Sequence, residues 1–180
     1  NGQASFGGIA GAILAGVAYL RLRGVPPRQV LLWFDLIAAV FPYAWFFGRL
    51  HCVLVHDHPG IGTSSWLGVR YPDAVRYDLG VLEILFLPVV LCLYWLLRRY
   101  SHIPGFYVAT FLASYGAFRM GLDRLHVEVL RYFYLSVDQW ASLLSMVCAG
   151  LIIRSMSMYI GPAPISATRN QVNLPERLIN

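Results

Sequence analysis

The chain is poor in charge and contains no lysine. Only 13% of its 180 residues are charged, and all fourteen basic residues are arginine. A soluble domain usually carries about 25% charged residues, so this low fraction favours a membrane as the solvent around much of the chain. The mean hydropathy of +0.58 agrees. The arginines are scattered through short polar segments and form no basic stripe, so no nucleic-acid partner is predicted.

The motifs of several enzyme classes are also absent. The sequence has no GxSxG element, no Ser/His/Asp order of a catalytic triad and no glycine-rich phosphate loop. Its three cysteines, Cys52, Cys92 and Cys148, form no CxxC pair, and we expect them to be small buried hydrophobic side chains. No cofactor is predicted.

Long apolar runs are the main feature that is present. Each of five runs is long enough, or nearly so, to cross a hydrocarbon core about 30 Å thick. The runs are residues 6–20, 30–48, 79–97, 104–122 and 140–153. The sequence therefore predicts an all-α, polytopic membrane helix bundle over residues 1–160, followed by a polar tail over residues 161–180. A loop over residues 49–78 is expected to carry a polar site on the outer face.

The segments between the runs indicate an orientation. The segments after the first and third runs carry arginines without acids, and Arg154 follows the fifth run. The other two segments mix arginine with acidic residues. By the positive-inside rule the acid-free segments face the cytoplasm. The start of the chain is thus expected outside the membrane and its C-terminus in the cytoplasm.

Helix rise places three ionisable side chains at one depth. Arg49 lies 21 residues after the last arginine of the preceding segment, which is about 31 Å along a helix and close to the outer interface. Arg119 lies 15 residues after Pro104, and Glu83 lies 15 residues before Arg98, roughly 22 Å in each case. Three charged groups from three helices are therefore expected in one layer.

A cluster of polar residues follows the second run. His51, His56, Asp57 and His58 lie close together in the sequence. Their spacing matches neither HExxH nor a paired Cys/His pattern, so no metal site is predicted. The functional interpretation is that one of these histidines acts as a general base, because the ordinary pKa of histidine lies close to neutral pH. Histidines in a wet loop without a chemical role are the alternative.

The fourth run carries a polar stripe. Tyr115, Arg119 and Asp123 follow one another at a spacing of four residues and so share one helix face. One interpretation is an Arg119–Asp123 ion pair with a tyrosine at the interface. The other is a cationic clamp for a lipid phosphate, because a guanidinium fork matches phosphate oxygens; Arg49 at the same depth favours it. Asp35, inside the second run, is expected to cap or pair with a neighbouring helix.

Short sequence elements follow one another in register from residue 5 to about residue 153. In chain order they are Ser5-Phe6-Gly7-Gly8, Asp35-Leu36-Ile37-Ala38, Pro42, Gly48-Arg49, Arg70-Tyr71-Pro72, Tyr77-Asp78 with Glu83, Pro104-Gly105, Tyr115-Gly116-Ala117-Phe118-Arg119 and Leu135-Ser136-Val137-Asp138-Gln139. Together they resemble the prolipoprotein diacylglyceryl transferase family. Members of that family have more spans than the five found here, so we expect a divergent chain that lacks the family's first part.

The resemblance implies an enzyme of the bacterial inner membrane that uses phosphatidylglycerol. Such an enzyme moves the diacylglyceryl group of this lipid onto the lipobox cysteine thiol next to a prolipoprotein signal peptide, and glycerol phosphate leaves. Arg49 and Arg119 match the family's phosphate-binding arginines. The full set of residues implied at the lipid is Gly7, Gly8, Arg49, Tyr115, Arg119 and Asp123.

The chain departs from the family pattern at the residues expected to handle protons. The family's histidine before the two glycines is absent, His51-Cys52 replaces Gly-Asn, and Asp57 stands in place of a glutamate. We therefore expect a substitute base, either His51 or His56, with Asp57 and Glu83 in supporting roles. Two alternatives remain open, namely a phospholipid-dependent transferase with a different acceptor and an inactive lipid-binding homologue.

Overall fold

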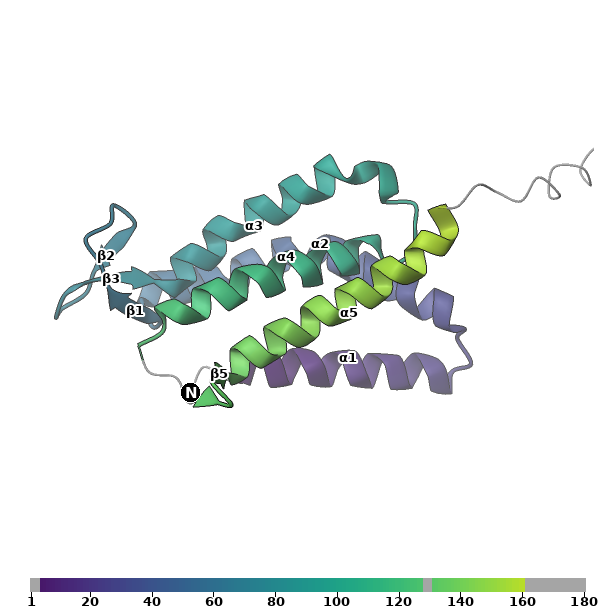
Figure 1. The fold of residues 1–180 in the computed structure, drawn as a ribbon, viewed down its shortest axis with the longest axis horizontal. Coiled ribbons are helices and arrows are strands. Elements are labelled where there is room, and N and C mark those ends of the chain that lie inside the picture. Colours follow the sequence, from purple (N-terminus) through teal and green to yellow (C-terminus); the bar gives the residue numbers. More distant parts are fainter. Residues whose placement is uncertain (1–3, 128–130, 161–180) are drawn as a thin grey trace, which may run out of the picture.

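Five long helices make up most of the structure, a computed structural model that describes residues 4–127 and 131–160 (Figure 1). In chain order the helices are α1 (Ala4–Leu22), α2 (Pro27–Val55), α3 (Leu79–Leu96), α4 (Phe106–Leu122) and α5 (Val137–Ile160). Short 3-10 turns, η1 (Arg98–Tyr100) and η2 (Asp123–Leu125), follow α3 and α4. Each of the five predicted runs falls on one of these helices, which confirms the helical bundle. The predicted polar tail lies outside the described residues.

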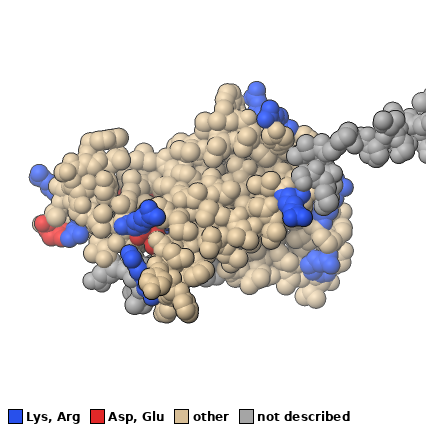
Figure 2. Space-filling view, in the orientation of Figure 1, with Lys and Arg blue, Asp and Glu red and all other residues tan. Residues whose placement is uncertain are grey.

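Length and composition agree with a membrane protein. In the described part of the chain α2, α3 and α5 are long and apolar enough to cross a membrane, and α1 adds a shorter apolar stretch, Ala10–Leu22. Helix α4 has 17 residues, which is still within the usual range of about 17–25 for a span. Figure 2 shows charged side chains gathered toward the two ends of the visible face, with a broad uncharged band between them.

The predicted loop over residues 49–78 needs correction, because much of it has regular structure. Helix α2 continues to Val55, and the rest holds three short strands, β1 (Pro59–Gly62), β2 (Gly68–Arg70) and β3 (Val75–Asp78). They form an antiparallel sheet in the order β1-β3-β2 that projects beyond the helices (Figure 1). Strand pairing joins residues that are distant in the sequence, so a search for local apolar patterns did not reveal this sheet.

A second small hairpin precedes α5. Its strands are β4 (Arg131–Tyr132) and β5 (Leu135–Ser136). Ser136 then caps α5: its hydroxyl accepts a hydrogen bond from Gln139 N at 3.0 Å, while Gln139 Oε1 accepts one from Ser136 N at 3.2 Å. This reciprocal capping box satisfies amides that would otherwise lack partners at the helix start.

Helix α4 lies between the others and packs most closely on α5 (Figure 1). Gly116 permits the close approach, since a Cβ there would lie 2.5 Å from Ser145 Oγ and 2.9 Å from Ser142 O. Helix α4 begins directly after Gly105, whose φ of 95° is a conformation that glycine adopts readily. Asp35 of α2 accepts a hydrogen bond from Val108 N at 2.9 Å, which confirms the prediction that this acid caps a neighbouring helix.

Candidate functional site

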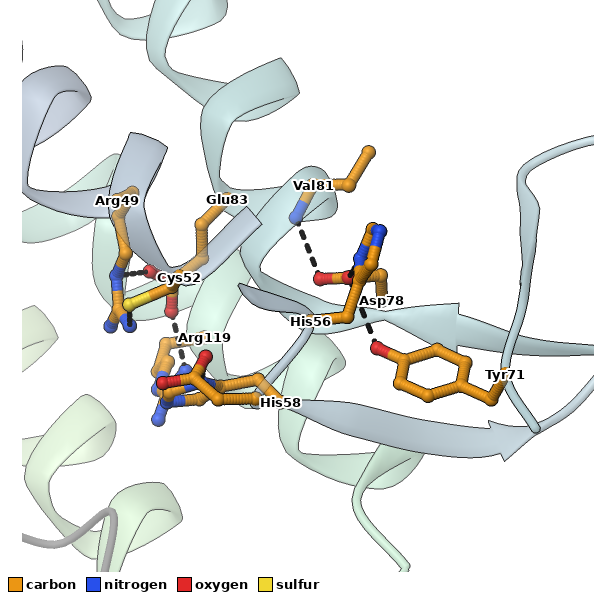
Figure 3. A network of polar contacts seen from close by, with 10 residues as sticks. Arg49, Cys52, His56, His58, Tyr71, Asp78, Val81, Glu83 and Arg119 are labelled. Carbon is orange, nitrogen blue, oxygen red and sulfur yellow. Dashed lines mark hydrogen bonds and ion pairs between the residues drawn. The ribbon is translucent and has the colours of Figure 1, made fainter. Parts of the chain in front are cut away.

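The three charged groups predicted at one depth meet in the structure. Arg119 Nη1 of α4 donates to Glu83 Oε1 of α3 at 2.6 Å, and Arg49 Nε of α2 pairs with the other carboxylate oxygen of Glu83 (Figure 3). The side chains of Arg49, Glu83 and Arg119 are only 11%, 2% and 9% exposed. Charges removed from water to this degree need partners, and here both guanidinium groups pair with the carboxylate of Glu83.

A fourth charge completes the cluster and was not among the candidates from the sequence. Asp138 Oδ2, in the first turn of α5, accepts a hydrogen bond from Arg119 Nη2 at 2.6 Å. The two arginines and two carboxylates sum to zero formal charge. The capping box that starts α5 at Ser136 and Gln139 is a sequence signal that could have placed Asp138 in a first helical turn.

Aromatic rings from α2 and α4 lie beside the arginine cluster. The guanidinium carbon of Arg49 lies 5.0 Å from the ring centroid of Trp45. Trp45 in turn contacts Tyr115, with centroids 6.2 Å apart, and Tyr115 stacks on Phe111 at 5.4 Å. Tyr115 thus contributes to an apolar wall beside the charges. Such a wall lowers the local dielectric and strengthens each electrostatic interaction within it.

Asp123 has a structural partner. It is 6% exposed, and its Oδ2 accepts a hydrogen bond from the Ser136 hydroxyl at 2.7 Å. This contact holds the capping residue of α5 against the turn that follows α4. The ion pairs of Arg119 go to Glu83 and Asp138. The Arg119–Asp123 pair considered from the sequence is therefore not the arrangement found among the described residues.

Gly7 and Gly8, implied at the lipid by the resemblance, lie in the first turns of α1. Outside this helix, no described atom comes within 4 Å of the place where a Cβ of Gly8 would be. The same holds for Gly11, whereas a Cβ at Gly16 would lie 3.3 Å from the Phe34 ring of α2. The structure therefore brings α1 onto α2 at Gly16 and does not bring Gly8 onto the arginine cluster.

A second polar network lies next to the cluster, at the start of α3 (Figure 3). His56 Nδ1 is 2.7 Å from Asp78 Oδ2, and the Tyr71 hydroxyl donates to the same oxygen at 3.0 Å. Asp78 Oδ1 accepts from Val81 N at 3.1 Å and so caps α3. Burial, followed by the hydrogen bond to Asp78, raises the pKa of Tyr71, which stays a neutral donor.

The other histidines near this site have different surroundings. His51 is exposed on α2. His58 pairs with Asp57; burial acts to raise the pKa of Asp57, but the hydrogen bond and charge of His58 outweigh it and the pKa lies below its usual range. The structure thus divides the four polar residues of the sequence cluster: His56 contacts Asp78, Asp57 pairs with His58, and the exposed His51 lies near enough to Asp57 to help lower its pKa.

One group of side chains near the site could hold a metal ion. Ligand atoms of Cys52, Asp57 and His58 lie within 4.8 Å of one another. Thiolate, imidazole and carboxylate together suit zinc or a similar ion. However, Arg49 Nη1 lies 3.9 Å from Cys52 Sγ, and a cation next to the thiol opposes binding of a second one.

His126 is a further neighbour that sequence reasoning missed. It follows η2, and Gly60 of β1 forms a bridge to it. A Cβ at Gly60 would lie 2.9 Å from Leu125 O, so glycine permits the sheet to sit close to the end of α4. Burial, and then the nearby charge of Arg119, lower the pKa of His126, which is neutral at neutral pH.

Comparison with known proteins identifies the family. The family model for prolipoprotein diacylglyceryl transferase matches residues 1–155. The phosphatidylglycerol–prolipoprotein diacylglyceryl transferase of Rhizobium leguminosarum bv. trifolii is 26% identical over 97% of this chain and 61% of its own length. The proteins of the same name from Rhizobium meliloti and Agrobacterium fabrum are 31% and 32% identical, over 77% and 73% of this chain.

The chain spans only part of the length of these relatives, 51% for the Rhizobium meliloti protein and 47% for the Agrobacterium fabrum protein. No solved structure matches. The family match nevertheless covers most of the chain, including α2, α3 and α4 with Arg49, Glu83 and Arg119. The chain belongs to the prolipoprotein diacylglyceryl transferase family.

Proposed function

We propose that this chain transfers the diacylglyceryl group of phosphatidylglycerol to the cysteine thiol of a prolipoprotein, with release of glycerol phosphate. One observation carries the proposal: Arg49 and Arg119, from two different helices, converge on the single carboxylate of Glu83. A carboxylate and a phosphate present similar oxygen pairs to guanidinium groups. The place that Glu83 occupies is thus where a lipid phosphate can be held between both arginines.

In this mechanism the arginines stabilise the leaving group. The thiolate of the acceptor attacks the glycerol carbon that carries the phosphate ester, a C–S bond forms and the C–O bond breaks. The electron pair moves to a phosphate oxygen, where the guanidinium groups of Arg49 and Arg119 neutralise the growing charge. Glu83 and Asp138 keep both arginines in place before lipid arrives. The nucleophile belongs to the acceptor, so the chain needs no nucleophile of its own.

The family supports an assignment to the bacterial inner membrane, and the distribution of charge supports a site on its outer face. The visible end of the bundle opposite the strands carries arginines without acids, whereas arginines and acids mix at the strand end (Figure 2). By the positive-inside rule the first end is cytoplasmic. The start of α1 is then outside and the end of α5 is inside, and the site meets the outer leaflet, where a secreted precursor arrives.

The test is transfer of labelled diacylglyceryl from phosphatidylglycerol to a lipobox peptide. Arg49→Ala and Arg119→Ala should each lower the rate by about 100- to 1,000-fold, as expected when one group that stabilises a developing oxyanion is removed. Arg124→Ala is the matched control, since Arg124 is exposed just beyond α4. Growth of a strain depleted of its own transferase should follow the same order.

Three outcomes would overturn the proposal. Unchanged transfer by both arginine variants would remove the clamp from the mechanism. Binding of phosphatidylglycerol without any transfer by the wild-type chain would instead identify an inactive lipid-binding homologue. A product formed only with a hydroxyl acceptor, detected by mass spectrometry, would identify a transferase with a different acceptor.

A further inference from the structure

We propose that His56 is the general base of this transfer and that Asp78 is the residue that positions it. The inference rests on the proposed function and assigns the proton-handling role left open by the sequence. His56 stands at the end of α2, and Asp78 stands immediately before α3. Their contact therefore joins the two helices that also carry Arg49 and Glu83.

The hydrogen bonds around Asp78 determine which nitrogen of His56 is basic. Asp78 is 1% exposed, and its carboxylate accepts hydrogen bonds from Val81 N and the Tyr71 hydroxyl. An ionised carboxylate can only accept, so the hydrogen between it and His56 belongs to Nδ1. Neutral His56 then has its lone pair on Nε2. In the described part of the chain Nε2 has no hydrogen-bond partner, and the side chain is 44% exposed.

Helix geometry distinguishes His56 from His51. His56 lies seven residues after Arg49 in the sequence, which is about two turns, or ~10 Å, along the same helix face. His51 lies two residues after Arg49, a rotation of about 200° that places it on the opposite face. Cys52, three residues after Arg49, contacts the Arg49 guanidinium and marks the shared face. The end of α2 therefore places the Cα of His56 on the side of the helix that carries Arg49, and the Cα of His51 on the other side.

The separation of the two networks along the axis of α3 is shorter. Glu83 lies five residues after Asp78, about 7.5 Å along the helix. Figure 3 shows the His56–Asp78–Tyr71 network and the Arg49–Glu83–Arg119 cluster side by side along the start of α3. In the proposed geometry the acceptor thiol lies between the two, with its proton toward His56 and its target carbon bonded to the phosphate held by the arginines.

The backbone at His56 is unusual and directs the side chain. Its φ and ψ of 48° and 44° are left-handed, a conformation disfavoured for a residue with a side chain. This residue ends α2 and turns toward Asp78. Backbone strain of this kind is often retained at functional sites. The titratable and charged groups around His56 are Asp78, Tyr71, Asp57 and, next to Tyr71, Arg76.

The proton and electron balance of the step is complete with these groups. His56 Nε2 takes the proton of the acceptor thiol, and the resulting thiolate forms the C–S bond while the C–O bond of the lipid breaks. Asp78 accepts the Nδ1 hydrogen bond and stabilises the imidazolium without taking its proton. The imidazolium then loses the extra proton to water or to the departing phosphate.

His56→Asn tests the base. Asparagine tolerates a left-handed backbone and can still donate to Asp78, but it cannot take up a proton. At pH 7 the rate of transfer should fall by about 100- to 10,000-fold, the usual contribution of general-base catalysis. His51→Asn, an exposed position on the opposite helix face, should keep the wild-type rate. If His56→Asn does not fold, His56→Gln serves in its place.

The pH profile separates a base from a structural residue. The His56→Asn rate should rise with pH as the acceptor thiol ionises in solution and should approach the wild-type rate above about pH 8.5, the ordinary pKa of a thiol. Loss of activity by the same factor at every pH would overturn the assignment. Asp78→Asn places an amide group opposite Nδ1 and should also lower the rate, with partial recovery in Asp78→Glu.

Phosphatidylglycerol binding distinguishes failure of this inference from failure of the proposed function. His56→Asn should bind the lipid as tightly as wild type, because the arginines are unchanged. If His56→Asn transfers at the full rate while Arg119→Ala does not, His56 is not the base and the transferase assignment stands. If wild type transfers nothing to a thiol, both are overturned.

Discussion

The two ends of the bundle each bury an acid, and they use it differently. At the strand end Glu83 of α3 pairs with guanidinium groups from α2 and α4. At the opposite end Asp35 of α2 accepts a hydrogen bond from the backbone amide of Val108 and lies next to Tyr94 and Tyr107. The buried cluster at that end is apolar and consists of Ile103, Phe106, Ala109 and Met156.

Under the proposed function, this difference explains why Glu83 rather than Asp35 belongs to the site. Asp35 satisfies amides at the start of α4, a task that any helix start requires and that leaves no charge for a ligand. Glu83 instead neutralises two arginine side chains, Arg49 and Arg119, and satisfying the helix backbone does not require this. In the proposed function a lipid phosphate takes over part of this pairing from Glu83, whereas a helix cap cannot be exchanged without loss of the helix start.

Removal of the Glu83 charge should have the largest effect. Glu83→Gln leaves two buried guanidinium groups with Asp138 as their remaining charged partner in the cluster, and loss of one partner of a buried pair costs about 3–5 kcal/mol of the free energy of unfolding. The measurement is thermal unfolding in detergent micelles. Added phosphatidylglycerol should restore more stability to this variant than to wild type. Asp73→Asn, at a 61% exposed side chain, is the control and should change little.

Close packing between α4 and α5 connects the two ends, and Gly116→Ala should disturb it. The new methyl group would overlap Ser145 and Ser142 of α5, so the helices must separate at a cost of about 1–3 kcal/mol. Separation also moves Asp138 away from Arg119, so the variant should transfer more slowly. Gly121→Ala has open space around it and should keep both stability and activity. Equal behaviour of the two variants would contradict the close contact.

Asp35→Ala should lower the free energy of unfolding by about 1 kcal/mol, the net value of a hydrogen bond. Asp35→Asn keeps a side-chain oxygen for the Val108 amide and should lose less. Neither change should alter phosphatidylglycerol binding, because Asp35 lies at the far end of the bundle from the arginine cluster. Weaker lipid binding by Asp35→Asn would show that the two ends are not separate in function.

The smallest effect expected is a dependence of stability on pH at His126. Its pKa in the folded state lies below the ordinary 6.5, so the unfolded chain takes up a proton first as the pH falls. Stability contributed by neutral His126 is therefore complete above about pH 6.5 and is lost progressively below it. His126→Gln removes this loss. Between pH 7 and pH 5 its melting temperature should fall less than that of wild type.

The positions of the charges along the helices could be predicted from the sequence, but their partners could not. Counting residues placed Arg49, Glu83 and Arg119 in one layer, since rise per residue is the same in every helix. Asp138 was missed because its role depends on where the β4–β5 hairpin delivers the first turn of α5. Asp123 was placed at the lipid, whereas the structure gives it Ser136 as a partner.

By itself the amino-acid sequence determined five helices, their approximate ends and the depth of each charge, because hydropathy and helix rise are local properties. Only the tertiary structure decided the rotation of each helix about its axis, and that rotation selects Glu83 for both arginines and Asp78 for His56. The sheet formed by β1, β2 and β3 was likewise decided by pairing between segments. Contacts of this kind depend on residues distant in the chain, and no local pattern specifies them.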